Sequence, residues 1–376
     1  MRAVVYRGAN DLRVETVPVP RIGARELLVR VAVCGVCPTD VKKIQHATLP
    51  PPRIFGHETA GFIARIGACV RGFRLGDRVA LYHHVPCLEC QACRHRAFAQ
   101  CAQYKRTGVT AGFEPAGGGY AEYARVMPFA LPGVVNVPSR NSLEEAAMLE
   151  PVNTVLKAVN RLRLLKGDSV LVVGQGPIGL MFTRLLRIAG MRVVATDLLE
   201  PRLALARRWG ASWTFRADSP ELSARLEDLT RGRGPDAAVV TAPSDTAVRQ
   251  AHQLVRGAGQ VLVFAHTQHG HHAQIDLAAV CVAEKDLIGS YSSDFTLQQE
   301  VARLVFSRAV AVESLITHRF PLERTAAAIA LAAHPLLESL KILVFNELHD
   351  KDARAMRGAN RPAAAARRAF GTGRNR

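Results

Sequence analysis

Two groups of residues in the first 150 positions carry side chains that bind transition metals. The first group is dispersed and consists of Cys37, His57 and Glu150, with Glu58 directly after the histidine. One thiolate, one imidazole and one carboxylate leave a fourth coordination position open, as a catalytic zinc ion requires. A single Cys or His is more often a core residue, so each of these residues alone is a weak signal and only the joint pattern carries weight.

The second group is a run of four cysteines with the spacing C-x2-C-x2-C-x7-C. Four thiolates on one short loop complete a tetrahedral shell around zinc and leave no position for a substrate, which predicts a structural site. Their crowding and a reducing cell interior disfavour disulfides. An iron–sulfur cluster is the alternative that the same thiolates allow. The four ligands are Cys87, Cys90, Cys93 and Cys101.

A glycine motif at residues 174–179 has the form that binds the pyrophosphate of a dinucleotide. It follows the apolar run VLVVG and begins a helical pattern. Its glycines permit a tight turn, close approach of the phosphates and close packing of helix on strand. The N-terminus of the helix adds unpaired N–H groups and partial positive charge. The cofactor-binding residues of the motif are Gly174, Gly176, Pro177, Ile178 and Gly179.

The acidic residue at the end of the next apolar run, Asp197, fits the ribose of the same cofactor. It stands 18 positions after Gly179, where a carboxylate can accept hydrogen bonds from both ribose hydroxyls. Because a carboxylate repels a 2′-phosphate, Asp197 favours NAD over NADP. NAD is therefore preferred, although Arg202 lies close enough in sequence to offset part of that repulsion and leave NADP open.

The elements that must position these residues follow two patterns. Residues 1–150 contain short alternating runs such as LLVRVAV between Gly and Pro, which predicts a β-rich domain. Residues 151–286 alternate apolar strands with helices, which predicts a doubly wound parallel sheet covered on both faces, and hence an α/β fold. Residues 287–346 add a helix and a last strand. Residues 347–376 form a basic tail without apolar periodicity, which predicts disorder.

Charge and hydropathy limit the partners. The formal net charge is +17, of which the tail contributes +5, and such a surplus favours anionic partners such as cofactor phosphates. The cysteine loop and the tail could instead form a nucleic-acid module, but no specific nucleic acid is expected. No apolar run reaches the roughly 20 residues of a membrane span, and the first residues do not resemble a secretory signal. We therefore expect a cytoplasmic protein without a membrane partner.

Over nearly its whole length, to about residue 346, the chain resembles the zinc-containing medium-chain dehydrogenases. Residues 56–70 fit the family pattern GHE-x2-G-x5-G-x2-V without a gap, and the cysteine loop and glycine motif follow in the family's order. The resemblance implies a GroES-like catalytic domain at 1–150 with its zinc lobe at 87–101, a Rossmann NAD-binding domain at 151–286, and a return to the catalytic domain at 287–346. It also implies a homodimer or homotetramer.

The resemblance assigns roles around the first metal. Cys37 and His57 are implied zinc ligands, and Asp40 is implied to orient His57 by a hydrogen bond. The third ligand is open between two carboxylates. Glu58 matches the ligand of many polyol dehydrogenases, and Glu150 stands where alcohol dehydrogenases have a third cysteine. We expect both carboxylates within one water of the metal, and two zinc ions per chain.

The implied reaction is hydride transfer between a secondary alcohol or polyol and NAD. Zinc lowers the pKa of a bound hydroxyl, from about 16 to near 7 for water, so that a zinc-bound alkoxide can pass a hydride to C4 of the nicotinamide. Thr39 occupies the family position that accepts the alcohol proton. Lys42 replaces the usual relay histidine, and it can pass a proton only if its pKa falls well below about 10.4.

Two further alternatives compete with this interpretation. A threonine dehydrogenase-like oxidation of an amino alcohol would need groups for an ammonium and a carboxylate, which the sequence does not reveal. A metal-stabilised binding protein without catalysis is disfavoured by the intact ligand set. The late segment GSYSSDF (289–295) lacks the arginine with which many polyol dehydrogenases anchor substrate hydroxyls, so the sequence does not identify the alcohol.

Seven further Cys and His residues are not expected to bind a metal. The run HTQHGHH predicts a solvated loop rather than a third metal site, and three isolated cysteines are predicted to be small buried residues. These residues are His266, His269, His271, His272, Cys34, Cys69 and Cys281.

Overall fold

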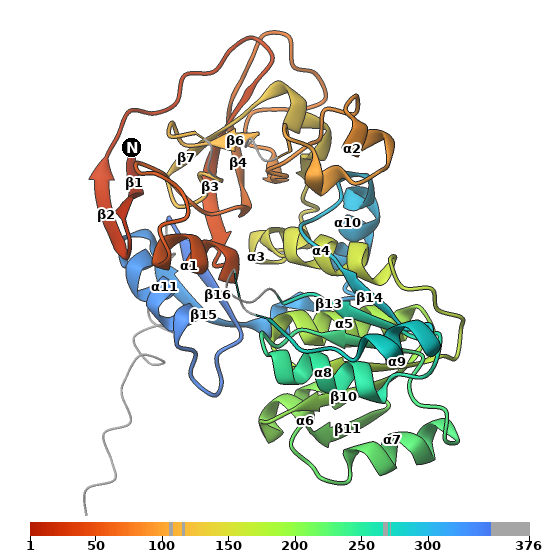
Figure 1. Cartoon of the computed structure of the whole chain (residues 1–376). Coiled ribbons are helices and arrows are strands. Elements are labelled where there is room, and N and C mark those ends of the chain that lie inside the picture. Colours follow the sequence, from red (N-terminus) through yellow and green to blue (C-terminus); the bar gives the residue numbers. More distant parts are fainter. Residues whose placement is uncertain (105–107, 115–116, 266–269, 271, 347–376) are drawn as a thin grey trace, which may run out of the picture.

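The computed structural model describes residues 1–104, 108–114, 117–265, 270 and 272–346 (Figure 1). Three histidines of the HTQHGHH run, at 266, 269 and 271, and the basic tail 347–376 lie outside the described residues, so the predictions made for them stay predictions. Within the described ranges, no helix has both the length and the apolar character that crossing a membrane demands.

The first and last parts of the chain share one mixed sheet, with strand order β15-β16-β3-β4-β5-β8 and with β7 pairing β3 and β6. A separate hairpin, β1 with β2, lies beside it. The strands are β1 (Arg2–Gly8), β2 (Asp11–Thr16), β3 (Leu27–Gly35), β4 (Glu58–Ile66), β5 (Arg78–Ala80), β6 (Val109–Thr110), β7 (Tyr123–Val126), β8 (Val135–Asn136), β15 (Ile316–Pro321) and β16 (Lys341–Phe345).

Short helices flank this sheet and lead into the second part of the chain. They are α1 (Pro38–Gln45), α2 (Gln91–Arg94), α3 (Leu143–Ala147), α4 (Leu149–Val159), α10 (Gln298–Phe306) and α11 (Thr325–Ala333), with short 3-10 helices η1 (Phe98–Gln100), η2 (Pro128–Gly133), η3 (Phe295–Leu297), η4 (Val312–Leu315) and η5 (Leu322–Arg324). Figure 1 shows α11 and β16 near α1, so segments from opposite ends of the sequence meet around the first metal group.

The middle of the chain forms a six-stranded sheet in the order β11-β10-β9-β12-β13-β14, and every neighbouring pair is parallel. Numbered from its first strand, this is the 3-2-1-4-5-6 order of a doubly wound dinucleotide-binding sheet. The predicted parallel sheet is confirmed. The strands are β9 (Ser169–Val173), β10 (Arg192–Asp197), β11 (Trp213–Arg216), β12 (Ala237–Val240), β13 (Gln260–Val263) and β14 (Asp286–Gly289), and the helices are α5 (Pro177–Ile188), α6 (Glu200–Arg208), α7 (Leu222–Thr230), α8 (Asp245–Leu254) and α9 (Leu277–Val282).

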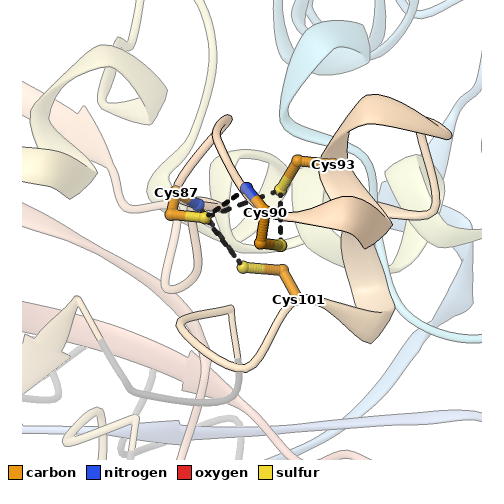
Figure 2. Close-up of side chains that lie close together, drawn as sticks. All are labelled: Cys87, Cys90, Cys93 and Cys101. Atoms are coloured by element: carbon orange, nitrogen blue, oxygen red, sulfur yellow. Dashed lines mark hydrogen bonds between the residues drawn. The ribbon is translucent and has the colours of Figure 1, made fainter.

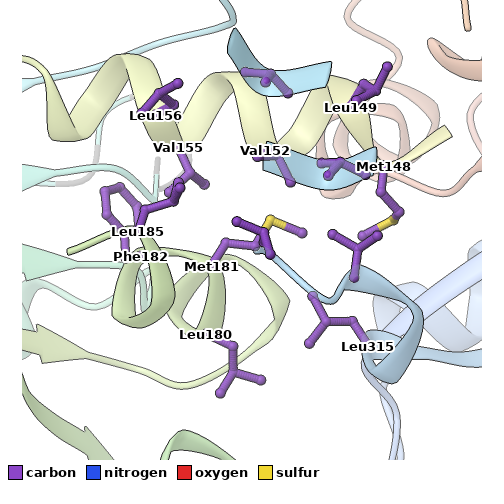
Figure 3. Packing of buried hydrophobic residues seen from close by; sticks show 14 of the residues in the cluster. Met148, Leu149, Val152, Val155, Leu156, Leu180, Met181, Phe182, Leu185 and Leu315 are labelled. Carbon is purple, nitrogen blue, oxygen red and sulfur yellow. The ribbon is translucent and has the colours of Figure 1, made fainter. Parts of the chain in front are cut away.

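Alternate residues of the central strands enter two different cores. Val170 and Val172 of β9 join a core that also contains α4 and α5, whereas Leu171 and Val173 join a second core with residues of α7 and α8. This alternation explains why the strand is apolar at every position: both faces of the sheet are covered. Figure 3 shows the first core, where Val152 and Val155 of α4 and neighbouring side chains meet residues of α5.

Candidate active site

The antiparallel pairing of β3 with β4 brings the dispersed metal-binding residues together. Gly35 at the end of β3 is paired with Glu58 at the start of β4. Cys37 lies just beyond β3 as the N-cap residue of α1, and His57 directly precedes β4. As a result, ligand atoms of Cys37, His57 and Glu58 all lie within 4.8 Å of one another. A soft thiolate, an imidazole and a carboxylate at this spacing fit a zinc ion with an open position.

The ring of His57 contacts a buried acid, Asp40, at the position to which the family resemblance assigned an orienting role. Its Nδ1 lies 3.2 Å from Oδ1 of Asp40, which is 1% exposed, and the hydroxyl of Tyr120 donates to Oδ2 of the same carboxylate at 3.4 Å. Burial raises the pKa of Asp40, but the charges of His57 and Lys43 and the hydrogen bonds with His57 and Tyr120 together lower it below its usual value, so the acid stays ionised. With Nδ1 bound to Asp40, Nε2 is the nitrogen left for a metal.

Glu58 has an ionic partner that sequence reasoning missed. Lys341, the first residue of β16, is 5% exposed; its Nζ contacts Oε2 of Glu58 and donates to the carbonyl of Val36 at 3.0 Å. Burial lowers the pKa of Lys341, but Glu58 and Cys37 raise it above the usual value, so the ammonium stays charged. The available signal was a lysine in the otherwise apolar run LKILVF, because a charge in a buried strand needs a partner.

Glu150 lies near this group but outside the set of mutually close ligand atoms found among the described residues. It is the second residue of α4 and is 7% exposed. Burial raises the pKa of its carboxyl to about 7, with His57, Glu58 and Lys341 close enough to act on its charge. Glu150 can therefore carry a proton at neutral pH close to the same group of residues.

The two predicted proton-transfer residues lie on α1, the helix that begins after Cys37. Thr39 is in its first turn and Lys42 one turn further, and both are partly buried. Burial lowers the pKa of Lys42, against a raising effect of Cys37. The direction is the one that a proton-relay lysine requires.

The four cysteines of the loop after β5 point toward one another, as Figure 2 shows. Three sulfur–sulfur distances are 3.6, 3.6 and 3.9 Å, and all four atoms lie within 4.8 Å. A tetrahedron with metal–sulfur bonds of about 2.3 Å has edges of roughly 3.8 Å, so the arrangement fits zinc. Burial raises the pKa of Cys93 to about 12; Cys101 is also buried, but backbone N–H groups hold its pKa at about 6. Four such thiols need a cation to be ionised together.

A row of rings that the sequence analysis did not single out connects this loop with the first metal group. The ring centroids of His57 and His83 are 4.9 Å apart, those of His83 and His84 3.9 Å, and those of His84 and Tyr104 5.0 Å. Burial lowers the pKa of His83 well below its usual value and that of His84 to about 3, so both rings are neutral. The adjacent pair HH before the cysteine loop was the available signal.

The glycine motif has the predicted geometry. Gly174 follows β9 with φ +90°, a backbone conformation that favours glycine. A Cβ on Gly179 would lie 1.8 Å from the carbonyl oxygen of Gly174, so only glycine permits the close approach of α5 to the turn. A Cβ on Gly176, the N-cap residue of α5, would meet nothing within 4 Å. The space beside Gly176 is thus open where a phosphate would approach, with Pro177 and Ile178 starting the helix behind it.

Asp197 lies at the end of β10 beside the glycine turn. One carboxylate oxygen accepts from the backbone N–H of Gln175 at 2.6 Å and the other from that of Leu199 at 3.0 Å. Arg202 approaches the same carboxylate at 3.9 Å, and its buried Nε has no hydrogen-bond partner within the described part of the chain. The acid is therefore fixed, while the guanidinium keeps donors available.

The isolated cysteines differ from expectation at two of three positions. Cys34 is buried, as predicted, and burial raises its pKa to about 12. Cys69 and Cys281 are exposed, so the prediction of burial is wrong for both. Cys69 lies outside β4 and Cys281 lies on α9, a helix with no buried residue.

Comparison with known proteins agrees with this geometry. Residues 23–139 match the family described as alcohol dehydrogenase GroES-like domain, and residues 177–307 match the family described as zinc-binding dehydrogenase. Sorbitol dehydrogenase from Bombyx mori is 30% identical over 352 residues, which cover 91% of this chain and 97% of that protein. The chain belongs to the zinc-containing medium-chain dehydrogenase family, with a GroES-like part and a Rossmann sheet.

Solved structures resemble the whole described architecture. Alcohol dehydrogenase TADH from Thermus sp. ATN1 has a TM-score of 0.80 at 26% identity, covering 92% of this chain and 99% of that chain. A zinc-binding dehydrogenase from Sinorhizobium meliloti 1021, bound to NADP, has a TM-score of 0.82 at 25% identity, covering 92% and 98%.

Proposed function

We propose that the protein is a zinc-dependent dehydrogenase that oxidises a secondary alcohol or polyol with a nicotinamide dinucleotide. The observation that carries this proposal is the convergence of Cys37, His57 and Glu58 on one point in a chain that also has an open glycine turn for a dinucleotide. The likeness to sorbitol dehydrogenase supports a polyol as the substrate class.

We assign the catalytic zinc to Cys37, His57 and Glu58, with Glu150 as the second carboxylate that faces it. Zinc bound there supplies Lewis acidity to an alcohol oxygen. The chain's own residues do the rest: Asp40 fixes the tautomer of His57, and the raised pKa of Glu150, about 7, lets this acid take or give a proton near neutral pH. Lys341 compensates the charge of Glu58 while Glu58 is not shared with a metal.

Proton transfer from the substrate hydroxyl is assigned to α1. Thr39 lies two residues after Cys37 and can accept the proton through its hydroxyl oxygen, and Lys42 lies one turn further along the helix. The lowered pKa of Lys42 favours its giving up a proton to solvent. This order replaces the histidine relay that the sequence resemblance implied for other family members.

NAD is the proposed cofactor, bound by the glycine turn and by Asp197. Support comes from the ionisable acid that the N–H groups of Gln175 and Leu199 hold at the end of β10, where it would meet the ribose hydroxyls. Arg202 and the likeness to an NADP-bound dehydrogenase make the comparison of both cofactors part of the test.

The second zinc is assigned to the four-cysteine loop, in a structural role. All four positions of the tetrahedron are protein sulfur, which leaves none for substrate.

We assign the catalytic part to residues 1–150 and 287–346 and the cofactor part to residues 151–286. Strand β14 (Asp286–Gly289) crosses the second boundary and pairs with the cofactor sheet. A cytoplasmic location stays a prediction.

A homo-oligomer is also proposed. On one edge of the cofactor sheet, β14 pairs only with β13 among the described strands, and apolar side chains beside it are exposed. They are Leu277 (76%), Val282 (84%), Leu287 (48%) and Tyr291 (51%). An unpaired edge with an apolar flank is suited to self-association, which would cover both.

The test combines metal analysis with a substrate panel. Purified protein is expected to hold two zinc ions per chain. The substrate panel contains linear polyols, secondary alcohols and threonine, and we expect a polyol to be oxidised. NAD should be reduced faster than NADP. Cys37→Ser should remove one zinc and the activity while the fold survives, and Cys93→Ser should instead lower stability. Full turnover by Cys37→Ser would contradict the catalytic assignment, and a preference for threonine would favour the amino-alcohol alternative.

A further inference from the structure

The ring row His57–His83–His84–Tyr104 joins the two metal groups through direct side-chain contacts. His83 is 5% exposed and lies between the ring of His57, with a 37° angle between planes, and the ring of His84, which meets it edge-on at 76°. Tyr104 stacks on His84 with a 22° angle between planes. The row therefore has no gap between the proposed catalytic ligand and the four-cysteine loop.

The far end of the row is anchored on both sides. The backbone N–H of Tyr104 donates to the carbonyl of Cys101 at 3.1 Å, so the ring belongs to the cysteine loop. Its hydroxyl donates to the carbonyl of Ser293 at 2.9 Å and lies 3.0 Å from the hydroxyl of Ser292. The near end is held as well, because the carbonyl of His83 accepts from the N–H of Gly108 at 2.8 Å.

One hydrogen bond does not fix the orientation of a metal-binding imidazole. The bond from His57 to Asp40 sets the direction of Nδ1, but the ring can still tilt about the line that joins the two atoms. A ring packed against the face of His57 opposes this tilt, and His83 lies at the distance where ring faces and edges make contact. Hydrogen-bonding groups that orient metal ligands change metal affinity by about 10- to 100-fold. For a packing group we expect an effect at the lower end of that range.

We propose that His83 is a positioning residue for His57, and that His84 and Tyr104 transmit the rigidity of the four-cysteine loop to it. The inference rests on the proposed assignment of His57 as a zinc ligand. This transmission gives the four-cysteine loop a second role. Loss of order in the loop would loosen His57, although His57 lies 44 positions before Cys101 in the sequence.

The experiment measures the catalytic metal directly. The intact two-zinc protein is treated with chelators of graded affinity to obtain the dissociation constant of the proposed catalytic zinc, which is the one that Cys37→Ser lacks. Co2+ is then loaded into the emptied catalytic position, and its absorption spectrum is recorded. We expect His83→Ala to weaken this metal by about tenfold and to shift the Co2+ bands. His83→Phe keeps a ring of similar size and should restore both values.

Tyr104→Leu tests the transmission along the row. It should shift the Co2+ bands of the catalytic position in the same direction as His83→Ala, because the ring of Tyr104 stacks on His84, the next ring of the row. Phe182→Leu is the matched control: it also removes a ring contact, that of Phe182 on α5 with Phe264 after β13 at 5.1 Å, but in the cofactor part of the chain. This control should lower the unfolding midpoint and leave the Co2+ spectrum unchanged.

Two outcomes would overturn the proposal. Wild-type affinity and spectrum in His83→Ala would show that packing on His57 is dispensable, and equal damage in His83→Phe would show that His83 acts through its nitrogen atoms. If His83→Ala does not fold, the same measurements are made on His83→Gln, which also lacks the ring. Failure of the proposed function is distinguishable, because it appears in the wild-type protein as missing zinc or missing turnover, before any variant is compared.

Discussion

At the scale of single residues, the carboxylate of Glu58 is tightly enclosed by two neighbours. On one side lies the ammonium of Lys341, and on the other the backbone of Gly35, its partner across the β3–β4 pair. A Cβ on Gly35 would lie 1.8 Å from Oε2 of Glu58 and 3.0 Å from Cε of Lys341. The glycine is therefore part of the site, because only a residue without a side chain leaves room for the acid.

Gly35→Ala is expected to displace Glu58 and to lower both the zinc content and the turnover. The overpacking should also reduce the free energy of unfolding by about 1–3 kcal/mol. Metal analysis and urea unfolding measure the two effects. Gly8→Ala is the control, since a Cβ at Gly8, the last residue of β1, would meet nothing within 4 Å. Unchanged zinc content in Gly35→Ala would argue against Glu58 as a ligand.

At the scale of elements, two glycines of the β9–α5 turn have different roles: Gly179 is needed for packing, and Gly176 leaves space for the cofactor. Gly179→Ala would push a methyl group onto the carbonyl of Gly174 and should destabilise the protein, by about 1–3 kcal/mol. Gly176→Ala meets open space in the protein and should leave stability nearly unchanged while weakening cofactor binding. Thermal unfolding and NAD titration by fluorescence separate the two. Equal NAD affinity in Gly176→Ala and wild type would contradict the placement of the phosphates.

The start of β9 depends on an ionised acid, which makes part of the stability depend on pH. Asp236 accepts from the N–H of Ser169 at 2.8 Å and from Nε of Arg256 at 2.7 Å. Burial raises the pKa of Asp236, but these donors lower it by more, to below its usual 3.8. A lowered pKa means that the contribution is complete above about pH 4 and is lost as the pH falls through the lowered value.

Asp236→Asn should therefore cost about 1–3 kcal/mol at pH 6 and progressively less below pH 4. Urea unfolding of both proteins at pH 6, 4 and 3 measures the difference. Asp218, an exposed acid paired with Arg216, gives the control Asp218→Asn, for which a small and nearly constant difference is expected. A difference for Asp236→Asn that grows toward acid would reverse the sign and refute the assignment.

At the scale of the whole molecule, the exposed edge of the cofactor sheet is the surface on which the proposed self-association depends. Val282→Asp places a charge on α9, at a side chain that is 84% exposed in the single chain. If a second copy covers this helix, the variant should dissociate to a smaller species, as measured by light scattering after size exclusion. Leu75→Asp, at a side chain 69% exposed elsewhere, should keep the wild-type mass. Equal masses for Val282→Asp and wild type would exclude this edge as the interface.

Local patterns in the sequence determined the parallel sheet, the glycine turn and the cysteine loop. Each is encoded within a short stretch: strands apolar at every position, three glycines in six residues, four cysteines on one loop. The likeness to known dehydrogenases added Cys37 and His57 as a pair. These features could be predicted because the residues that act together are close in sequence or match a family pattern.

Only the tertiary structure decided which distant residues complete the site. Lys341 reaches Glu58 because β16 pairs with β3. His83 lies against His57 because β5 pairs antiparallel with β4, so that the residues after Ala80 run beside those before Ala60. Whether a side chain is buried depends on which other segments of the chain cover it, and a local sequence pattern does not contain this information. For this reason the exposure of Cys69 and Cys281 could not be predicted. Partners that are 26 to 283 positions apart are set by strand register and packing, and these are properties of the folded chain.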